Sequence, residues 1–143
     1  MPLPEFAFKL KTFGTGFSKM THRLLAEIKP EDVTLLQFEI LHLLYTEDST
    51  TFGRIGACVG MSLPNTSREV KKLMEKKLVT KRADLKDKRV HFVELSPAGM
   101  ELMDECSARL EKLIAERFAH LNPKETAEVM QALDLLSEKL LGE

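Results

Sequence analysis

Apolar residues recur at every third or fourth position through the first 28 residues of the chain. They are Phe6, Leu10, Phe13, Phe17, Met20, Leu24 and Ile28. This spacing predicts one long helix with a single apolar side. Gly14 and Gly16 weaken it, because a glycine inside a helix costs up to about 1 kcal/mol relative to alanine. So much apolar surface near a terminus favours packing against a second subunit.

Polar residues mark where this helix ends and the next begins. Lys29-Pro30 ends the first helix, since the residue before a proline is pushed out of the helical region. Thr34 and Gln37 have the spacing of a capping box, with Thr34 as the N-cap. They predict a second helix that reaches about Glu47.

Two helices joined by a tight turn are predicted after residue 50. Thr51 is placed to cap a short helix over 52–59. Gly60 then supplies a left-handed residue at the helix end, and Ser62 caps the following helix, which is predicted over 63–77. This order is a helix-turn-helix.

The apolar pattern changes from a helical to an alternating period after Leu78. The β-prone runs 79–82 and 90–95 flank a charged segment, which predicts a β-hairpin. Two further helices are predicted, one from Ser96-Pro97 and one from a capping box at Asn122-Pro123-Lys124-Glu125. The predicted fold class is mainly α (α+β): four helices, a β-hairpin, then two helices.

Composition narrows the class of protein. The length of 143 residues suits one domain, and 43% hydrophobic with 30% charged residues is typical of a soluble globular protein. No apolar stretch approaches the roughly 20 residues of a membrane span, and the first residues lack the features of a secretion signal. The two cysteines cannot form a disulfide framework. We therefore expect a cytoplasmic protein.

Charge is unevenly distributed, although the formal net charge of the whole chain is −1. Residues 51–95 carry 11 basic and 5 acidic side chains, a net charge of +6, between flanks of −2 and −5. A basic block between acidic flanks is expected of a module that meets phosphate groups. A solvated basic face would give the same count, so charge alone leaves both interpretations open.

The helix predicted over 63–77 adds chemistry to this charge. With Val70 at the centre of its buried side, Pro64, Asn65, Arg68 and Lys72 lie within about 60° of the opposite pole. Recognition helices of this motif present their N-terminal residues to base edges in the major groove. Arg68 is therefore the predicted base reader, through a bidentate bond to guanine; the alternative is an ordinary surface helix.

The neighbouring residues of this helix have weaker predictions. Asn65, Thr66 and Ser67 are secondary candidates for base contact, since Thr66 points inward and Ser67 lies at the flank. Lys71 and Lys72 are predicted to contact phosphates, which position a protein on DNA without reading its sequence.

The tip of the predicted hairpin concentrates charge. Lys86, Lys88 and Arg89 lie within four positions, with Asp87 among them. Because an acidic side chain would oppose DNA, we hypothesise that Asp87 holds Arg89 by an ion pair, so that the guanidinium projects into a narrow minor groove.

These features together resemble the winged-helix domain of MarR-family transcriptional regulators. The resemblance rests on Val33–Leu41, Ile55–Ser62, Ser67–Leu73, Leu78-Val79 and Asp87–Arg89 running into Leu95-Ser96. It implies a winged helix-turn-helix lobe with a β-hairpin wing over 33–95, flanked by helical dimerisation regions over 1–29 and 96–143. It also implies a homodimeric repressor that binds a pseudo-palindromic operator in double-stranded DNA and is released by a small, often aromatic ligand or by thiol oxidation.

The predicted DNA-binding residues combine the helix-turn-helix, the hairpin tip and this resemblance. They are Arg54, Ser62, Pro64, Asn65, Thr66, Ser67, Arg68, Lys71, Lys72, Lys86, Asp87, Lys88 and Arg89. A winged-helix interaction module that does not bind DNA is the alternative, and the salt dependence of DNA binding separates the two.

Three positions depart from the family pattern. Lys77 stands where glycine is usual, so the helix end must tolerate a Cβ or use another cap. Gly53 and Gly56 predict that the short helix is either soft or unusually closely packed. Thr66 replaces an apolar residue on the buried side, and its hydroxyl needs a partner there.

The remaining candidates for chemistry are weak. Cys58 and Cys106 are interpreted as buried or half-buried thiols, and the scattered histidines have no metal-ligand spacing. No catalytic or cofactor motif is present, so neither an enzyme nor a cofactor is predicted. Four aromatic residues are candidates for a ligand cavity, although packing in a core is the favoured interpretation. They are Phe13, Phe17, Phe38 and Tyr45.

Overall fold

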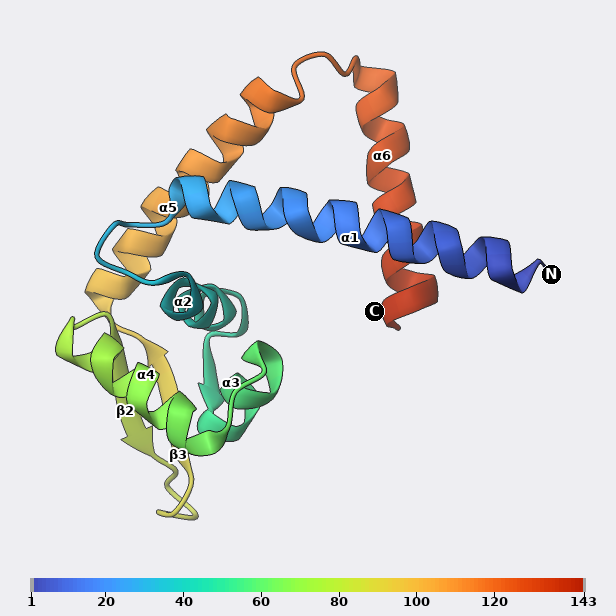
Figure 1. The fold of residues 1–143 in the computed structure, drawn as a ribbon. Helices are drawn as coiled ribbons and strands as arrows, with labels where there is room; N and C mark the ends of the chain where they lie inside the picture. The colour runs from blue at the N-terminus through green and yellow to red at the C-terminus, as the bar shows by residue number, and fades with distance from the viewer. Residues whose placement is uncertain (1, 143) are drawn as a thin grey trace. The chain divides into compact units, whose positions relative to one another are not determined.

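A computed structural model describes residues 2–142 of the chain (Figure 1). The chain divides into two compact units, residues 1–110 and 111–143, and each is described by itself. The predicted helices and the predicted hairpin are all present within the described residues. The mainly helical winged-helix fold class is thereby confirmed.

The first unit begins with α1 (Leu3–Ile28), the long helix predicted from the apolar spacing. Only Leu24 and Ile28 of this helix are buried, Met20 is partly exposed, and the earlier large apolar residues are exposed. These exposed residues are Leu3, Phe6, Phe8, Leu10, Phe13 and Phe17. The helix therefore packs through its last two turns and leaves most of its apolar side uncovered by the described residues.

The second helix, α2 (Leu35–Glu47), begins at the predicted capping box. Thr34 Oγ1 accepts from the Gln37 N–H (3.1 Å), and Gln37 Oε1 accepts from the Thr34 N–H (3.2 Å). Its residues Phe38, Ile40, Leu41 and Leu44 are almost fully buried. This helix is the centre of the core.

The helix-turn-helix consists of α3 (Phe52–Val59) and α4 (Leu63–Glu75), with Gly60 in the left-handed region (φ 71°). α4 ends at Glu75, two residues before the predicted end at Lys77. The reason is that Lys77 adopts a positive φ of 62°. The N–H groups of Lys77 and Leu78 return to the carbonyls of Met74 and Leu73, which closes a Schellman cap despite the Cβ.

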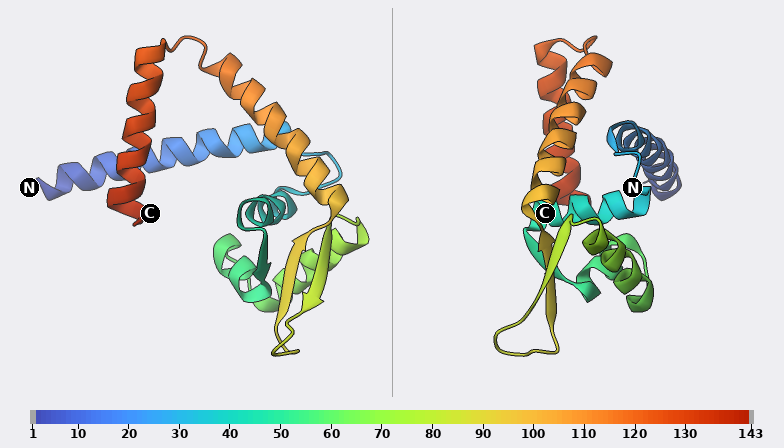
Figure 2. Two further views of the ribbon diagram at one scale, coloured as in Figure 1. Left: turned by 180° about the vertical axis from the view of Figure 1, so that it is seen from behind. Right: turned by 90° about the vertical axis from the view of Figure 1, so that its left-hand side faces the viewer.

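Three antiparallel strands form the sheet, in the order β1-β3-β2. The predicted hairpin is β2 (Val79–Ala83) and β3 (His91–Leu95), and its loop extends beyond the sheet (Figure 2). The additional strand β1 (Ser49–Thr51) pairs with β3, with Thr50 opposite Val93. It was not predicted, because three polar residues carry no alternating pattern.

The last two helices were also predicted. α5 (Pro97–Arg117) buries Met103 and Cys106 in the first unit. The second unit contains α6 (Pro123–Leu136), which begins at the predicted Asn122 capping box, and a π-helical turn (Ser137–Leu141). No residue of α6 is buried by the described part of the chain. No helix within residues 2–142 combines the length and apolar character that crossing a bilayer requires.

Candidate DNA interface

The N-terminal turn of α4 is fixed by its cap and by the turn before it. Ser62 Oγ accepts from the Asn65 N–H (3.3 Å), and the Ser62 carbonyl accepts from both the N–H and the hydroxyl of Thr66 (2.9 Å each). The predicted need of Thr66 for a partner is thus confirmed. Because Thr66 is fully buried, it is absent from the surface, which is a correction to its inclusion among DNA contacts.

Gly56 explains how closely α3 approaches α4. A Cβ on Gly56 would lie 2.9 Å from both the Met61 carbonyl oxygen and Thr66 Oγ1. The predicted close packing is therefore confirmed at Gly56. It does not apply to Gly53, where an added Cβ would meet nothing within 4 Å among the described residues.

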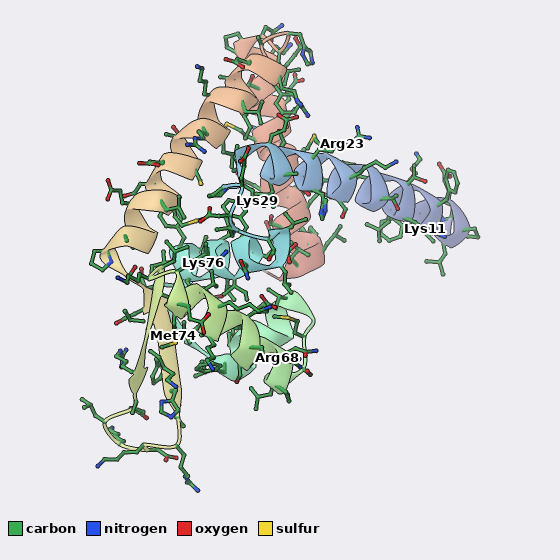
Figure 3. The ribbon with its side chains drawn as sticks, turned by 60° about the vertical axis from the view of Figure 1, so that its left-hand side comes forward. Lys11, Arg23, Lys29, Arg68, Met74 and Lys76 are labelled. Atoms are coloured by element: carbon green, nitrogen blue, oxygen red, sulfur yellow. The ribbon has the colours of Figure 1, made fainter. Side chains whose placement is uncertain are left out.

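The outer face of α4 exposes most of the predicted recognition residues. Pro64, Asn65, Ser67, Arg68, Lys71 and Lys72 are all exposed. The Arg68 guanidinium donates to Asn65 Oδ1 at 2.5 Å, so the two candidate base readers are held together. Arg68 is labelled in Figure 3. Lys72 pairs with Glu69 at 3.3 Å. An exposed, mainly basic face whose two base-reading candidates are adjacent is suited to a major groove.

Arg54 is engaged by a carboxylate in the structure. Its guanidinium donates to Glu47 at 2.7 and 3.3 Å. This contact holds the pKa of Glu47 below its ordinary value, while burial opposes the change. To contact a phosphate, the Arg54 guanidinium would have to bind it together with Glu47 or release Glu47. The role of Arg54 in DNA binding stays a prediction.

The wing tip has the predicted ion pair between Asp87 and Arg89. Asp87 Oδ1 accepts from the backbone N–H (3.0 Å) and Nε (3.1 Å) of Arg89, and Oδ2 accepts from a terminal guanidinium nitrogen at 3.2 Å. These bonds hold the pKa of Asp87 below its ordinary value, so it is ionised at physiological pH. The Arg89 side chain is 91% exposed, and Lys86 and Lys88 are exposed beside it. The pair is confirmed, whereas its role on DNA stays a prediction.

A hollow of about 710 Å³ lies between α4 and the wing. Lys71, Lys81 and Arg89 contribute cations to its lining, and Val70 and Met74 contribute apolar surface. Lys81 was absent from the predicted set, although strand alternation places it on one face with Val79 and Ala83. His91 also lines the hollow, and its Nδ1 is buried without a hydrogen-bond partner among the described residues.

The four aromatic residues of the predicted ligand cavity occupy different environments. Phe13 and Phe17 stack with ring centroids 5.5 Å apart and are 52% and 40% exposed. Phe38 is in the core, and the Tyr45 hydroxyl donates to Asp104 at 2.7 Å. None of the four lines the hollow beside α4. The cavity stays a prediction.

The two cysteines differ in exposure. Cys106 is buried as predicted, and burial raises the pKa of its thiol. Cys58 is exposed on α3, so the interpretation of it as a buried or half-buried thiol is wrong, because that side of the short helix faces outward. Within the described residues, no group of three or more His, Cys, Asp or Glu side chains could hold a metal ion.

A helix-turn-helix followed by a basic β-hairpin defines the winged-helix class of DNA-binding proteins. Comparison with known families gives the narrower assignment. Residues 31–90, which include the helix-turn-helix and most of the wing, match the model of the MarR family. The resemblance predicted from the sequence is confirmed over this segment.

Individual relatives agree with this assignment. The chain is 25% identical over 134 residues to the HTH-type transcriptional regulator TcaR of Staphylococcus aureus, covering 92% of this chain and 88% of TcaR. It shares its fold with RV1404 from Mycobacterium tuberculosis, with a TM-score of 0.73 at 18% identity over 98% of this chain and 95% of that chain. It also shares its fold with a cysteine-to-serine mutant of MarR from E. coli complexed with operator DNA, with a TM-score of 0.68 at 22% identity over 95% and 99% of the two chains. The predicted class, a DNA-binding transcriptional regulator, is confirmed.

Proposed function

We propose that the chain acts as a homodimeric repressor that binds a pseudo-palindromic operator in double-stranded DNA. The observation that carries this proposal is the pairing of two surfaces in one unit. One is the exposed face of α4 with Asn65 and Arg68 side by side, and the other is a wing on which Asp87 holds the exposed Arg89. In the proposed complex, α4 enters a major groove and the wing reaches the adjacent minor groove.

The homodimer is supported by uncovered apolar surface. Phe6, Phe13 and Phe17 of α1 are at least 40% exposed, and Met130 and Leu133 of α6 are also exposed. Apolar surface of this extent is typical of an interface between subunits. A two-fold dimer would place its two α4 helices on half-sites about one helical turn apart, near 10 bp.

Four further features belong to the proposal. The protein works in the cytoplasm, has no catalytic activity and needs no cofactor. A small aromatic effector that releases it from DNA is included as a candidate. A thermal-shift screen with aromatic acids and dyes tests the effector, since a ligand that binds the folded state raises the midpoint of unfolding.

The function is tested by selecting bound fragments from the source genome with the full-length protein. We expect enrichment of a pseudo-palindrome, and a steep fall of affinity with salt. Lysines 71, 72, 86 and 88 of two protomers would neutralise about eight phosphates, which gives a slope of log K against log[salt] of about −7. Weak, salt-insensitive binding to every duplex would favour the alternative, an interaction module that does not bind DNA.

A further inference from the structure

The carboxamide of Gln37 lies between the start of α2 and the middle of α4. Gln37 is only 3% exposed. Its Oε1 accepts from the Thr34 N–H (3.2 Å), and its Nε2 donates to Glu69 Oε2 (3.0 Å). The same side chain therefore completes the cap of α2 and binds a carboxylate on the recognition helix.

Lys76 joins the same oxygen from the far end of α4. Its Nζ donates to Gln37 Oε1 (3.3 Å) and to the carbonyl of Asp32, in the connector between α1 and α2. Glu69 and Lys76 are seven residues apart, which is about two helical turns. α4 is therefore tied to the beginning of α2 at two separated points, one anionic and one cationic.

Glu69 is the part of this cluster that needs an explanation. A carboxylate on a helix that faces phosphates opposes DNA binding unless its charge is engaged. One of its oxygens accepts from Gln37, the other pairs with Lys72 at 3.3 Å, and the side chain is 18% exposed. Glu69 thus bridges Gln37 of α2 and Lys72 on the outer face of α4, and both of its oxygens are engaged.

Directional hydrogen bonds constrain α4 in a way that its apolar contacts do not. Val70 and Leu73 are fully buried, but apolar packing is non-directional. Hydrogen bonds weaken steeply when their angles change. Bonds at two points two turns apart restrict both the sliding of α4 and its rotation about its own axis.

We propose that Gln37 is a positioning residue for DNA recognition. By holding Glu69 and Lys76, it fixes the rotation of α4, so that Asn65 and Arg68 meet base edges in the required geometry. The inference rests on the proposed function. Contacts to bases have narrow geometric tolerance, whereas flexible lysines reach phosphates from many orientations. Loss of this link therefore lowers sequence discrimination more than total DNA affinity.

The test is a swap of the two side chains. Gln37→Glu places two carboxylates within about 3 Å, and like charges at this distance repel. Glu69→Gln keeps an amide oxygen that accepts from Gln37. The double variant Q37E/E69Q restores a donor on α4 and an acceptor on α2, and has the composition and net charge of the natural chain. Gln131→Glu, on exposed α6, adds the same charge elsewhere.

The measured quantity is the ratio of affinities for the operator fragment selected by the natural chain and for a scrambled duplex of equal length. Temperature and salt are held constant, at a point where every variant is folded and has the same size by gel filtration. We expect the ratio to fall roughly 10-fold in Q37E, to stay within about 3-fold of the natural value in E69Q and Q131E, and to recover in the double variant.

Two outcomes overturn the proposal. One is a natural ratio in Q37E, and the other is a double variant that discriminates as poorly as Q37E. If Q37E does not fold, Glu69→Ala is the second variant, because it removes the acceptor of Gln37 at a partly exposed position. An unchanged ratio in E69A also overturns the proposal. A natural chain with no sequence preference would overturn the proposed function together with this inference, whereas discrimination that survives Q37E overturns the inference alone.

Discussion

Gly99→Ala is expected to destabilise the protein through one backbone contact. Gly99 is buried in the first turn of α5, next to the residue that follows the cap of α4. A Cβ at this position would lie 2.0 Å from the carbonyl oxygen of Leu78 and 3.0 Å from its carbonyl carbon. Since the obstacle is backbone, no change of side-chain rotamer relieves it. Either α5 or the segment between α4 and β2 has to move.

The magnitude follows from the hydrogen bonds at this junction. The Leu78 carbonyl accepts from the Ser96 N–H (3.0 Å). Ser96 Oγ donates to the Lys77 carbonyl (2.7 Å) and accepts from the Gly99 N–H (3.0 Å). Overpacking costs about 1–3 kcal/mol and a lost hydrogen bond about 1 kcal/mol, while alanine gains less than about 1 kcal/mol in helix propensity. We expect the free energy of unfolding to fall by roughly 2–3 kcal/mol.

Guanidinium unfolding followed by far-ultraviolet circular dichroism measures this change. Protein concentration is kept constant, because dissociation of a dimer contributes to apparent stability. Gly53→Ala is the matched control, because Gly53 also lies on a helix and an added Cβ would meet nothing within 4 Å among the described residues. G53A should be as stable as the natural chain or up to about 1 kcal/mol more stable. A G99A variant as stable as G53A would refute the reasoning.

Three other predictions concern binding and thiol chemistry. Arg89→Ala should weaken operator binding, because the guanidinium that would enter the minor groove is lost; Asp87→Ala should also weaken operator binding, and tighter binding would contradict the positioning role of Asp87. Arg68→Ala should relax discrimination at one base pair of each half-site, at a cost of about 1–3 kcal/mol per contact. Competition with operators substituted at each position checks this, and uniform weakening across them would instead assign Arg68 to phosphate. Cys58 should react with a thiol reagent in the folded protein, whereas Cys106 should react only on unfolding, since burial raises its pKa; equal rates in the folded protein would contradict the assigned exposures.

Local signals predicted most of the fold because helix boundaries depend on nearby residues. The capping boxes at Thr34 and Asn122 and the cap at Ser62 are satisfied within three residues of themselves. The apolar spacing in the same segments predicts which side is buried. Strand β1 could not be predicted in this way, because it depends on pairing with β3. At Lys77 the sequence left two alternatives open, a tolerated Cβ or another cap, and the positive φ of Lys77 shows that the Cβ is tolerated.

The sequence predicted which residues form the candidate site better than it predicted the contacts between them. Spacing along one helix placed Arg68 opposite Val70, and the Asp87–Arg89 pair joins residues two positions apart. By contrast, two hydrogen bonds of the site join residues on different helices. Arg54 donates to Glu47, and Gln37 donates to Glu69. No spacing rule connects residues that meet only after the core has formed. The prediction that Cys58 is buried or half-buried was wrong for the same reason, since its exposure depends on how α3 packs in the folded chain.

Two acidic residues of the basic segment 51–95 pair with cations of the proposed DNA interface. Asp87 and Glu69 each hold a cation on the same element, Arg89 and Lys72 respectively. Surface ion pairs are weak and screened by salt, so a phosphate can compete for the cation of such a pair. The Asp87 pair differs, because its carboxylate also accepts from the backbone of Arg89 and so shapes the loop itself. Glu69 is therefore expected to give up Lys72 on DNA, while Asp87 keeps the wing in its bound form and reduces the side-chain ordering that binding requires.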